Sequence, residues 1–249
     1  IDVSPENKNY SSIDGQFIIG KSSIEKENFD VLVFSVKNIK NPQIPDFIEI
    51  IGKYSFSDCR EINKIEISSN SRLQIIDEFA FENSSIESIT IPPHLTKICE
   101  NAFFSCDNLQ EVTIPSDSEL RIIEKNAFFF CSIKSIHIPS KTIELDDCFN
   151  EAYNLNSISV SPDNQHYSSI DGKFIVSKSS QDKENFDVLL FSVRNIEKVK
   201  IPDSIEIIGS HAFTNCNYIE EVEISANSKL RIFGKESFTK SSIKKIKIP

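Results

Sequence analysis

The sequence predicts a β-rich solenoid, and three observations support that prediction. One pattern of spaced apolar residues, clearest from Ile86 to Cys106, returns with small changes along the chain. A phenylalanine recurs at intervals of 25, 22, 25 and 21 residues, then 64, then 25. Each phenylalanine precedes three aliphatic residues spaced as L-x-x-L-x-L. A short period with that spacing predicts a leucine-rich-repeat solenoid, in which every turn adds one strand to a parallel sheet. The marker phenylalanines are Phe56, Phe81, Phe103, Phe128, Phe149, Phe213 and Phe238.

One turn of the repeat gives the expected secondary structure. Ile86, Ile89 and Ile91 suit a short strand whose alternate side chains face a core. Pro92 ends the strand, because proline has no amide hydrogen for the next ladder bond. From Leu95 to Cys106 the chain returns through irregular or one-turn helical structure. We therefore expect a parallel sheet of about ten strands on a concave face, starting at Ile1-Asp2-Val3, and a convex side of short helical or irregular segments.

A longer repeat overlies the short one. Residues 1–92 recur without a gap as residues 158–249, with 53 of the 92 aligned positions identical, which indicates duplication of a block of turns. In each block one segment interrupts the short repeat, residues 4–36 and residues 161–193. Both contain Y-S-S-I-D-G-x-F-I, and Asp-Gly between apolar runs is typical of a β-hairpin because both residues tolerate positive φ. We expect two β-hairpin inserts that project from the solenoid, with polar turns at 24–28 and 181–185.

Composition narrows the classes of partner. The net charge of −10 and a pI near 5.0 argue against nucleic acid and anionic membranes, which require clustered Lys and Arg. No apolar run approaches the roughly 18 residues of a membrane-spanning helix, and no signal peptide is recognisable. Since the chain opens inside a strand and has no Met, we interpret residues 1–249 as a fragment of a single solenoid flanked by further repeats.

The cysteines and histidines do not form a recognisable reactive site. Cys59, Cys106, Cys131 and Cys216 each follow a marker phenylalanine by three residues, so they form a column of small buried side chains. No C-x-x-C pair, phosphate-binding glycine loop or G-x-S-x-G motif occurs. We predict no metal, no cofactor and no enzymatic activity. A Cys106–Cys131 disulfide is an alternative to free thiols, which we favour because parallel stacked side chains seldom reach the required torsion.

Two surfaces are candidates for ligand binding. Along the strands, the residue between the two inward side chains points outward, and this row on the concave face is where solenoids bind. The two inserts are the other candidate, but their similar sequences suggest selection for structure, so we favour the row. Asn9 and Asn83 also match the N-glycosylation acceptor motif. The candidate ligand-binding residues of the row are Glu66, Thr90, Thr113, His137, Ser159, Lys200 and Glu223.

The unit L-x-x-I-x-I-P-x-x-L-x-x-I-x-x-x-A-F-x-x-C, as from Leu109 to Cys131 with one short insertion, resembles the BspA-like leucine-rich repeats of bacterial and protozoan surface proteins. The Y-S-S-I-D-G hairpin is also similar to one that interrupts those arrays. The resemblance implies a non-enzymatic cell-surface or extracellular adhesin that binds host matrix proteins or other cells, with no catalytic residue to transfer. An intracellular or periplasmic protein-interaction scaffold with the same fold is the alternative.

Overall fold

The computed structural model of this protein describes residues 1–248, and β-strands are the regular elements among them. The chain divides into two compact units, each a β-solenoid with mostly parallel pairing, as the sequence predicts. Unit 1 comprises Ile1–Ile133 and Lys141–Ala152, and unit 2 comprises Lys134–Ser140 and Tyr153–Pro249.

The strands expected from the aliphatic triplets are present, and we call them the first strand row. Alternate residues along them are buried and exposed, as in Ile89 and Thr90. The predicted opening strand is wrong, because Ile1-Asp2-Val3 forms no ladder and the Ile1 amine instead donates to the Gly15 carbonyl at 3.0 Å. In unit 1 the row consists of β4 (Gln43–Ile44), β6 (Glu66–Ile67), β8 (Ser88–Thr90) and β10 (Glu111–Thr113). In unit 2 it consists of β12 (Ser135–Ile138), β14 (Ser157–Val160), β18 (Lys198–Lys200), β20 (Glu221–Glu223) and β22 (Lys245–Lys247).

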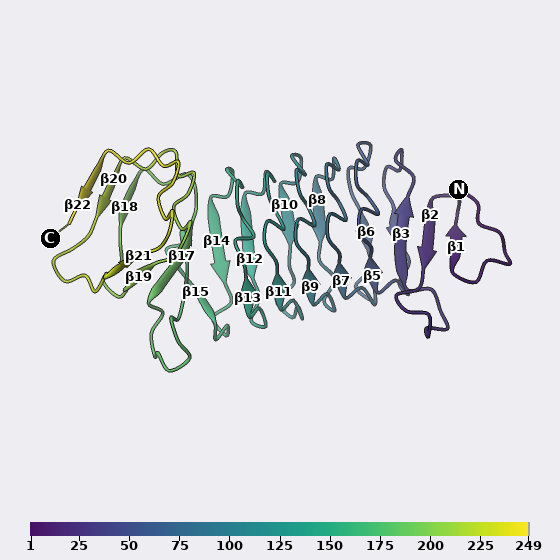
Figure 1. The fold of residues 1–249 in the computed structure, drawn as a ribbon, viewed down its shortest axis with the longest axis horizontal. Coiled ribbons are helices and arrows are strands. Elements are labelled where there is room, and N and C mark those ends of the chain that lie inside the picture. The colour runs from purple at the N-terminus through teal and green to yellow at the C-terminus, as the bar shows by residue number, and fades with distance from the viewer. Residues whose placement is uncertain (249) are drawn as a thin grey trace. The chain divides into compact units, whose positions relative to one another are not determined.

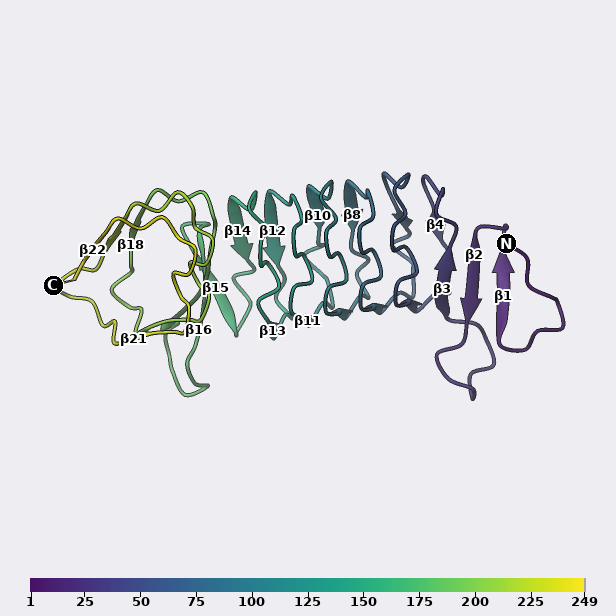
Figure 2. The ribbon, with the colours of Figure 1, turned by 45° about the horizontal axis from the view of Figure 1, so that its top comes forward.

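A second strand row replaces the helical pieces that we considered for the return segment. Its two-residue strands pair in parallel, for example Ile75 with Ile50 and Ile76 with Ile51. Within unit 1 the two rows follow opposite edges of the turns (Figures 1 and 2). No helix occurs in residues 1–248, so short strands joined by irregular segments form the side where we expected helical or irregular structure. The second row consists of β5 (Ile50–Ile51), β7 (Ile75–Ile76), β9 (Lys97–Ile98), β11 (Ile122–Ile123) and β13 (Glu144–Leu145) in unit 1, and β19 (Ile207–Ile208) and β21 (Ile232–Phe233) in unit 2.

The corner around each marker phenylalanine explains why no helix forms there. The Phe103 N–H donates to the Ala127 carbonyl of the next turn at 2.9 Å instead of to its own turn. The residues two before and two after the phenylalanine have positive φ, as at Asn101 (57°) and Ser105 (55°). A left-handed residue on each side interrupts α-helical geometry, and bonds between turns satisfy the backbone groups that a helix would pair internally.

The marker phenylalanines form the centre of the core. In unit 1 the ring centroids of Phe56, Phe81, Phe103 and Phe128 follow at 5.0, 5.0 and 5.3 Å, with planes within 5° of parallel, and Phe149 continues the stack at 5.9 Å. These distances are close to the spacing of paired strands, about 4.8 Å, because equivalent residues of successive turns lie one strand apart. All five rings are buried, so each phenylalanine packs mainly against its own counterparts.

The two hairpins are present, and their loops at 21–30 and 178–187 extend away from the turns (Figure 1), while the hairpin strands join the second row. β1 (Tyr10–Ile13), β2 (Phe17–Gly20) and β3 (Val31–Ser35) pair antiparallel in unit 1, as do β15 (Tyr167–Ile170), β16 (Phe174–Ser177) and β17 (Val188–Ser192) in unit 2. Gly15 and Gly172 both have φ of 65° in the hairpin turns. β3 then pairs in parallel with β5, and β17 with β19, so each insert supplies the first strand of a second row.

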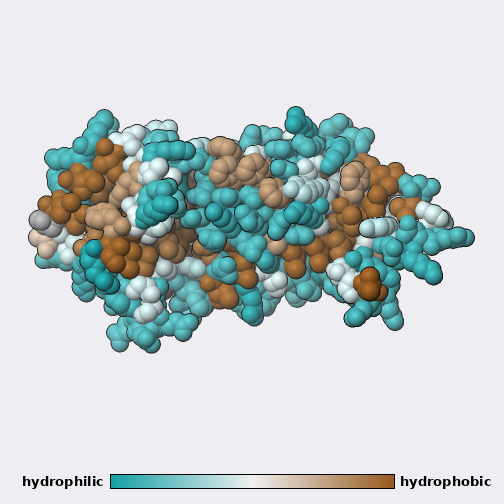
Figure 3. All heavy atoms as spheres, in the orientation of Figure 1, coloured by the Kyte–Doolittle hydropathy of each residue, from teal (hydrophilic) through white to brown (hydrophobic). Residues whose placement is uncertain are grey.

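The last turn of unit 2 exposes residue types that earlier turns bury. Phe233 is 47% exposed and Ile246 is 42% exposed, whereas their counterparts Ile208 and Val222 are fully buried. Hydrophobic residues accordingly gather beside β20 and β22 on the face shown in Figure 3. This contrast indicates that each turn obtains much of its burial from the turn stacked upon it.

Candidate functional site

In unit 1 the structure places Glu66, Thr90 and Thr113 on the outward face of the first strand row. All three side chains are exposed, and Thr90 lies directly opposite Thr113 in the β8–β10 ladder. Glu66 lies opposite Gln43 in the β4–β6 ladder. Strand alternation positions them, since each lies between two inward-facing aliphatic residues. The predicted residues of unit 1 therefore share one polar sheet face.

Glu66 and Thr90 also line a shallow depression of about 340 Å³ beyond the ends of their strands. Its apolar lining comes from Pro92, Pro93 and Pro115 together with three isoleucines of the aliphatic triplets, and Lys64 also lines it. Proline at the end of a strand presents a ring and no N–H, so the ladder stops and apolar surface remains. The prolines were recognisable in the sequence as strand terminators, but nothing in the spacing indicated that two turns would bring their rings together. An apolar lining bordered by a carboxylate and a hydroxyl can bind a side chain of a partner protein.

In unit 2 the predicted residues form two groups with different electrostatics. His137 is half-buried and its Nδ1 lies 2.9 Å from the Ser159 Oγ, across the β12–β14 pair. Lys200 and Glu223 are exposed and lie opposite each other on β18 and β20. One group is a hydrogen-bonded histidine–serine pair, and the other is a cross-strand pair of opposite charges.

Sequence reasoning missed a polar groove along the second strand row of unit 1. It has a volume of about 490 Å³, and both carboxylates and guanidinium groups line it. Its residues precede the buried aliphatic pairs of the second row, a position that we did not consider because we expected no strand there. Its lining residues are Glu49, Arg72, Gln74, His94, Thr96, Glu119 and Arg121.

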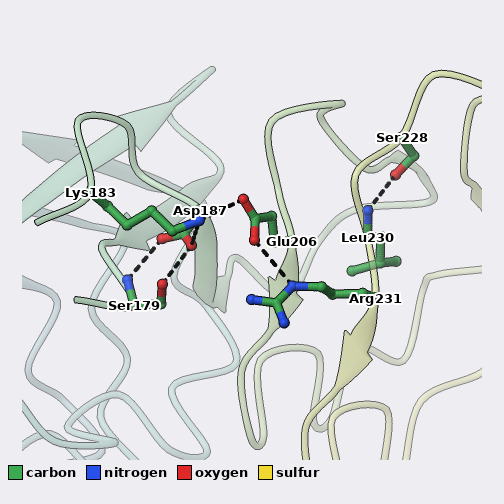
Figure 4. A network of polar contacts seen from close by, with 7 residues as sticks. All are labelled: Ser179, Lys183, Asp187, Glu206, Ser228, Leu230 and Arg231. Carbon is green, nitrogen blue, oxygen red and sulfur yellow. Dashed lines mark hydrogen bonds and ion pairs between the residues drawn. The ribbon is translucent and has the colours of Figure 1, made fainter.

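A network of ion pairs and hydrogen bonds connects each insert loop to residues next to the second strand row. In unit 2 the Lys183 ammonium lies 3.3 Å from the Asp187 carboxylate and 2.7 Å from that of Glu206, and Arg231 Nε donates to Glu206 at 3.1 Å (Figure 4). The Ser179 N–H and hydroxyl both donate to Asp187, at 2.8 and 2.6 Å. Burial opposes ionisation of Asp187, but these hydrogen bonds outweigh it and lower the pKa of that carboxyl.

Unit 1 repeats this network. The Lys26 ammonium lies 2.7 Å from Asp30 and 2.5 Å from Glu49, and the Ser22 N–H donates to Asp30 at 2.8 Å. Burial again opposes ionisation of Asp30, while the bonds from Lys26 and Ser22 lower its pKa overall. The sequence shows these residues at corresponding positions of the two blocks, but their contact with the second strand row became visible only in the structure. The insert loops are held by specific ion pairs.

The six cysteines are free and buried. The Cys106 and Cys131 thiols donate to the carbonyls of Phe81 and Phe103, at 2.9 and 3.1 Å. Burial raises the pKa of the Cys99 thiol to about 12 and also raises the pKa of Cys131. A thiol with a raised pKa carries little thiolate at neutral pH and is a poor nucleophile. Among residues 1–248, no group of three or more His, Cys, Asp and Glu side chains is placed to hold a metal ion.

The two candidate glycosylation sites lie at the surface. Asn9 is exposed just before β1, and Asn83 is exposed at a corner with φ of 53°. Asparagine tolerates this left-handed conformation better than most residues, which is a structural reason for Asn83 independent of any glycan.

Together, the stacked turns, the parallel rows and the polar first-row face define a leucine-rich-repeat protein. The chain belongs to the family with BspA-type leucine-rich repeat regions, whose model matches six copies over residues 27–156 and 184–249. Proteins of this family and fold are generally non-enzymatic and generally bind other proteins.

Solved structures of bacterial proteins share the fold at low sequence identity. The pneumococcal vaccine antigen PcpA matches with a TM-score of 0.76 and 19% identity, over 100% of this chain and 71% of that protein. A leucine-rich cell-surface protein from Faecalibacterium prausnitzii matches with a TM-score of 0.63 and 21% identity, over 95% of this chain and 76% of that protein. A leucine-rich repeat protein from Bacteroides ovatus matches with a TM-score of 0.57 and 18% identity, over 100% and 77%.

No curated protein sequence matches the chain. Within residues 1–248 there is no helix long and apolar enough to cross a membrane.

Proposed function

We propose that this chain is a non-enzymatic recognition module of a cell-surface adhesin, and that it binds host matrix or cell-surface proteins through the first strand row. The observation that carries the proposal is the depression beside Glu66 and Thr90, where exposed polar groups border an apolar lining of proline and isoleucine side chains. Such a surface gives a protein side chain both burial and hydrogen bonds. The cell-surface neighbour supports the extracellular location by analogy of fold.

The rest of the predicted row extends the proposal to further contacts. Thr113 offers a second hydroxyl opposite Thr90, and in unit 2 the His137–Ser159 pair offers an imidazole and a hydroxyl. Lys200 and Glu223 offer charges of both signs. A partner segment with mixed polar and apolar side chains fits these groups better than nucleic acid, which a chain of net charge −10 repels.

A binding assay on immobilised basement-membrane matrix tests the proposal. The first-row variant Glu66→Lys, Thr90→Lys, Thr113→Lys should lose at least about tenfold in affinity, since it alters the rim of the depression. The control Glu61→Lys, Gln74→Lys, Asn108→Lys adds the same charge at exposed positions away from that face and should bind like the wild type. If the control loses as much affinity as the first-row variant, net charge and not the face governs binding.

A third variant tests the inserts without breaking their ion pairs. Serine replaces exposed or half-buried loop residues while Lys26 and Lys183 stay, because those lysines hold the loops. Loss of binding here, with the first-row variant unaffected, would assign binding to the inserts. No binding by the wild type would contradict the matrix-ligand proposal. The replaced residues are Ile24, Glu25, Glu27, Gln181, Asp182 and Glu184.

Surface labelling separates the adhesin from the intracellular or periplasmic scaffold. Intact cells that express the protein from its own gene are treated with a membrane-impermeant biotin reagent, which modifies exposed lysines. Labelling before lysis supports the adhesin. Labelling only after lysis, with an outer-surface control labelled normally, supports the scaffold.

A further inference from the structure

Five aromatic side chains form a continuous stripe on the corner side of unit 1, which we call the aromatic stripe. Ring centroids follow at 5.2 Å from Tyr54 to Phe79, 6.3 Å to Phe104, 5.0 Å to Phe129 and 4.6 Å to Phe130. Tyr54 is 45% exposed and Phe130 is 43% exposed, and the three between them are half-buried. These rings lie outside the buried column of marker phenylalanines. The stripe is therefore apolar surface additional to the core.

Backbone conformation gives no reason for aromatic residues at three of these positions. Tyr54, Phe79 and Phe130 have φ of 58°, 54° and 55°, in the left-handed region that bulky residues rarely adopt. Other corners of the same unit place Asn101 and Asn126 in this conformation, and asparagine accommodates it more easily. Residues held in an unfavourable backbone conformation concentrate at functional sites. The aromatic side chains are thus retained against a local conformational preference.

The duplicated block shows that the solenoid does not require these rings. In residues 158–249 the counterparts of Tyr54 and Phe79 are His211 and Glu236, which have φ of 60° and 56°. The buried Phe213 remains at the position of Phe56. The same corner therefore folds with polar side chains, and the stripe is a property of unit 1 rather than of the repeat.

Ring orientation restricts what the stripe can bind. The Tyr54–Phe79 and Phe104–Phe129 pairs are stacked, with planes 16° and 2° apart, so the faces within each pair cover each other. A sugar or nucleobase stacks on an open aromatic face, but the inner faces of these pairs cover each other. The Lys53 ammonium lies over the Tyr54 and Phe79 rings, 5.6 and 5.9 Å from their centroids, which shows that a cation is accommodated there. Ring edges instead suit contact with aliphatic side chains. The stripe is long enough for an extended protein segment of about five or six residues.

The charges beside the stripe favour a basic segment. Within four positions of a ring in sequence lie six carboxylates and three ammonium groups, a net charge of −3. Lys53 pairs with Glu78, whereas neither Glu82 nor Glu100 forms an ion pair with any residue that the structure describes. A second copy of this chain would bring the same carboxylates together and repel. The nine flanking residues are Lys53, Asp58, Asp77, Glu78, Glu82, Glu100, Asp107, Lys125 and Lys134.

We propose that the aromatic stripe is a second docking surface, which binds an extended protein segment that combines aliphatic and basic side chains. Aliphatic groups of that segment cover the ring edges, while its lysine or arginine side chains pair with Glu82 and Glu100. This surface lies on the corner side of the turns and is separate from the first strand row, so the two surfaces are tested independently.

The test uses a stripe variant that should fold at least as well as the wild type. The variant carries Tyr54→Asn, Phe79→Asn and Phe130→Asn. Asparagine is chosen because Asn101 and Asn126 already adopt the same left-handed backbone conformation in this unit. The matched control is Tyr218→Asn, which removes a 63% exposed tyrosine in unit 2. The probe is a fluorescent peptide of about ten residues that alternates leucine and arginine. Leucine–glutamate and serine–arginine peptides of the same length are compared with it by fluorescence anisotropy at physiological salt.

We expect the wild type and Tyr218→Asn to bind the leucine–arginine peptide at least about tenfold more tightly than either comparison peptide. The stripe variant should lose that preference while its urea midpoint stays equal or rises. Glu82→Gln with Glu100→Gln should weaken leucine–arginine binding and reduce its salt dependence.

Four results would overturn the proposal: no wild-type preference for the leucine–arginine peptide, unchanged binding by the stripe variant, a fall in its urea midpoint, or self-association that the variant abolishes. A lower midpoint would assign the rings to stability, and self-association would assign the stripe to contacts between copies of this chain.

Discussion

Replacing Phe103 by alanine tests the central feature of the core, the like-on-like stacking of marker phenylalanines. Phe103 is fully buried, and its ring stacks on Phe81 at 5.0 Å and on Phe128 at 5.3 Å. The substitution removes the ring from the middle of the column and leaves a cavity with an aromatic face on each side. Phenylalanine-to-alanine changes in cores cost about 3 to 5 kcal/mol of unfolding free energy, depending on how far the site collapses.

The surroundings of Phe103 place the expected cost in the upper part of that range, about 4 to 5 kcal/mol. Its N–H is bonded to the Ala127 carbonyl at 2.9 Å, and its carbonyl accepts from the Cys131 thiol at 3.1 Å. These bonds fix the corner backbone of adjacent turns, so the turns cannot move together to fill the space. Two stacking contacts, each worth about 0.5 to 1.5 kcal/mol, are lost as part of the total.

Urea unfolding followed by far-ultraviolet circular dichroism measures the effect. With a urea slope of about 3 kcal/mol per molar, the midpoint should fall by more than about 1 M. Phe47→Ala is the matched control, because Phe47 is 43% exposed, and it should change stability by less than about 1 kcal/mol. An unchanged midpoint for Phe103→Ala would show that the column does not support the fold and would refute the reasoning.

Two further predictions concern the loop network and the thiols. Asp187→Asn should cost about 1 to 3 kcal/mol at pH 7, because it breaks charge-assisted hydrogen bonds to a buried carboxylate. The folded-state pKa of Asp187 is lowered, so its stabilisation is present above about pH 4 and lost as the pH falls through that lowered pKa. Urea midpoints of the variant and wild type should therefore converge as the pH falls below about 4, while exposed Asp182→Asn should match wild type throughout. A difference for Asp187→Asn that stays constant with pH would contradict this cause. Thiol titration in denaturant without reductant should find all six cysteines reactive. The native protein should react slowly, because its thiols are buried. Fewer than six reactive thiols in denaturant would indicate disulfide bridges.

The sequence was sufficient for the first strand row and the phenylalanine column because both depend on a long repeated pattern. Aliphatic residues with the spacing of Ile86, Ile89 and Ile91 follow each marker phenylalanine, and that repetition makes the period visible. The second strand row was missed because a two-residue strand such as Ile75–Ile76 is too short for alternation to distinguish it from a helical or irregular return. Inter-turn hydrogen bonds, which no local pattern records, decide the conformation there.

The hairpins also show that a local sequence pattern does not reveal which strands pair when they are far apart in the chain. Asp14-Gly15 and Asp171-Gly172 correctly predicted the turns, because positive φ is a local requirement. That β3 continues into a parallel pair with β5 depends on contact between Val31 and Ile50, which are distant in sequence. The sequence therefore did not indicate that the strands of each insert begin a row, although its loop extends away from the turns as predicted.

For the candidate site, alternation correctly predicted which side chains face outward, as at Glu66, Thr90 and Thr113. It did not indicate which of these residues would adjoin the proline depression, because that depends on the stacking of turns. The aromatic stripe was missed for a related reason. Phe79 precedes a marker phenylalanine by two residues and Phe104 follows one directly, so no single repeat position connects them.

The stacking of identical residues from turn to turn also affects how such a chain can change in length. Since phenylalanine meets phenylalanine and isoleucine meets isoleucine at successive turns, the surface that ends one turn resembles the surface that begins another. A segment of DNA encoding whole turns can be copied or deleted by recombination without creating a mismatched junction in the core. The matching blocks 1–92 and 158–249, identical at 53 of 92 positions, are the outcome expected of such an event. Each added turn extends the array by about 4.8 Å, so reach can vary among related genes while the fold of every turn is preserved.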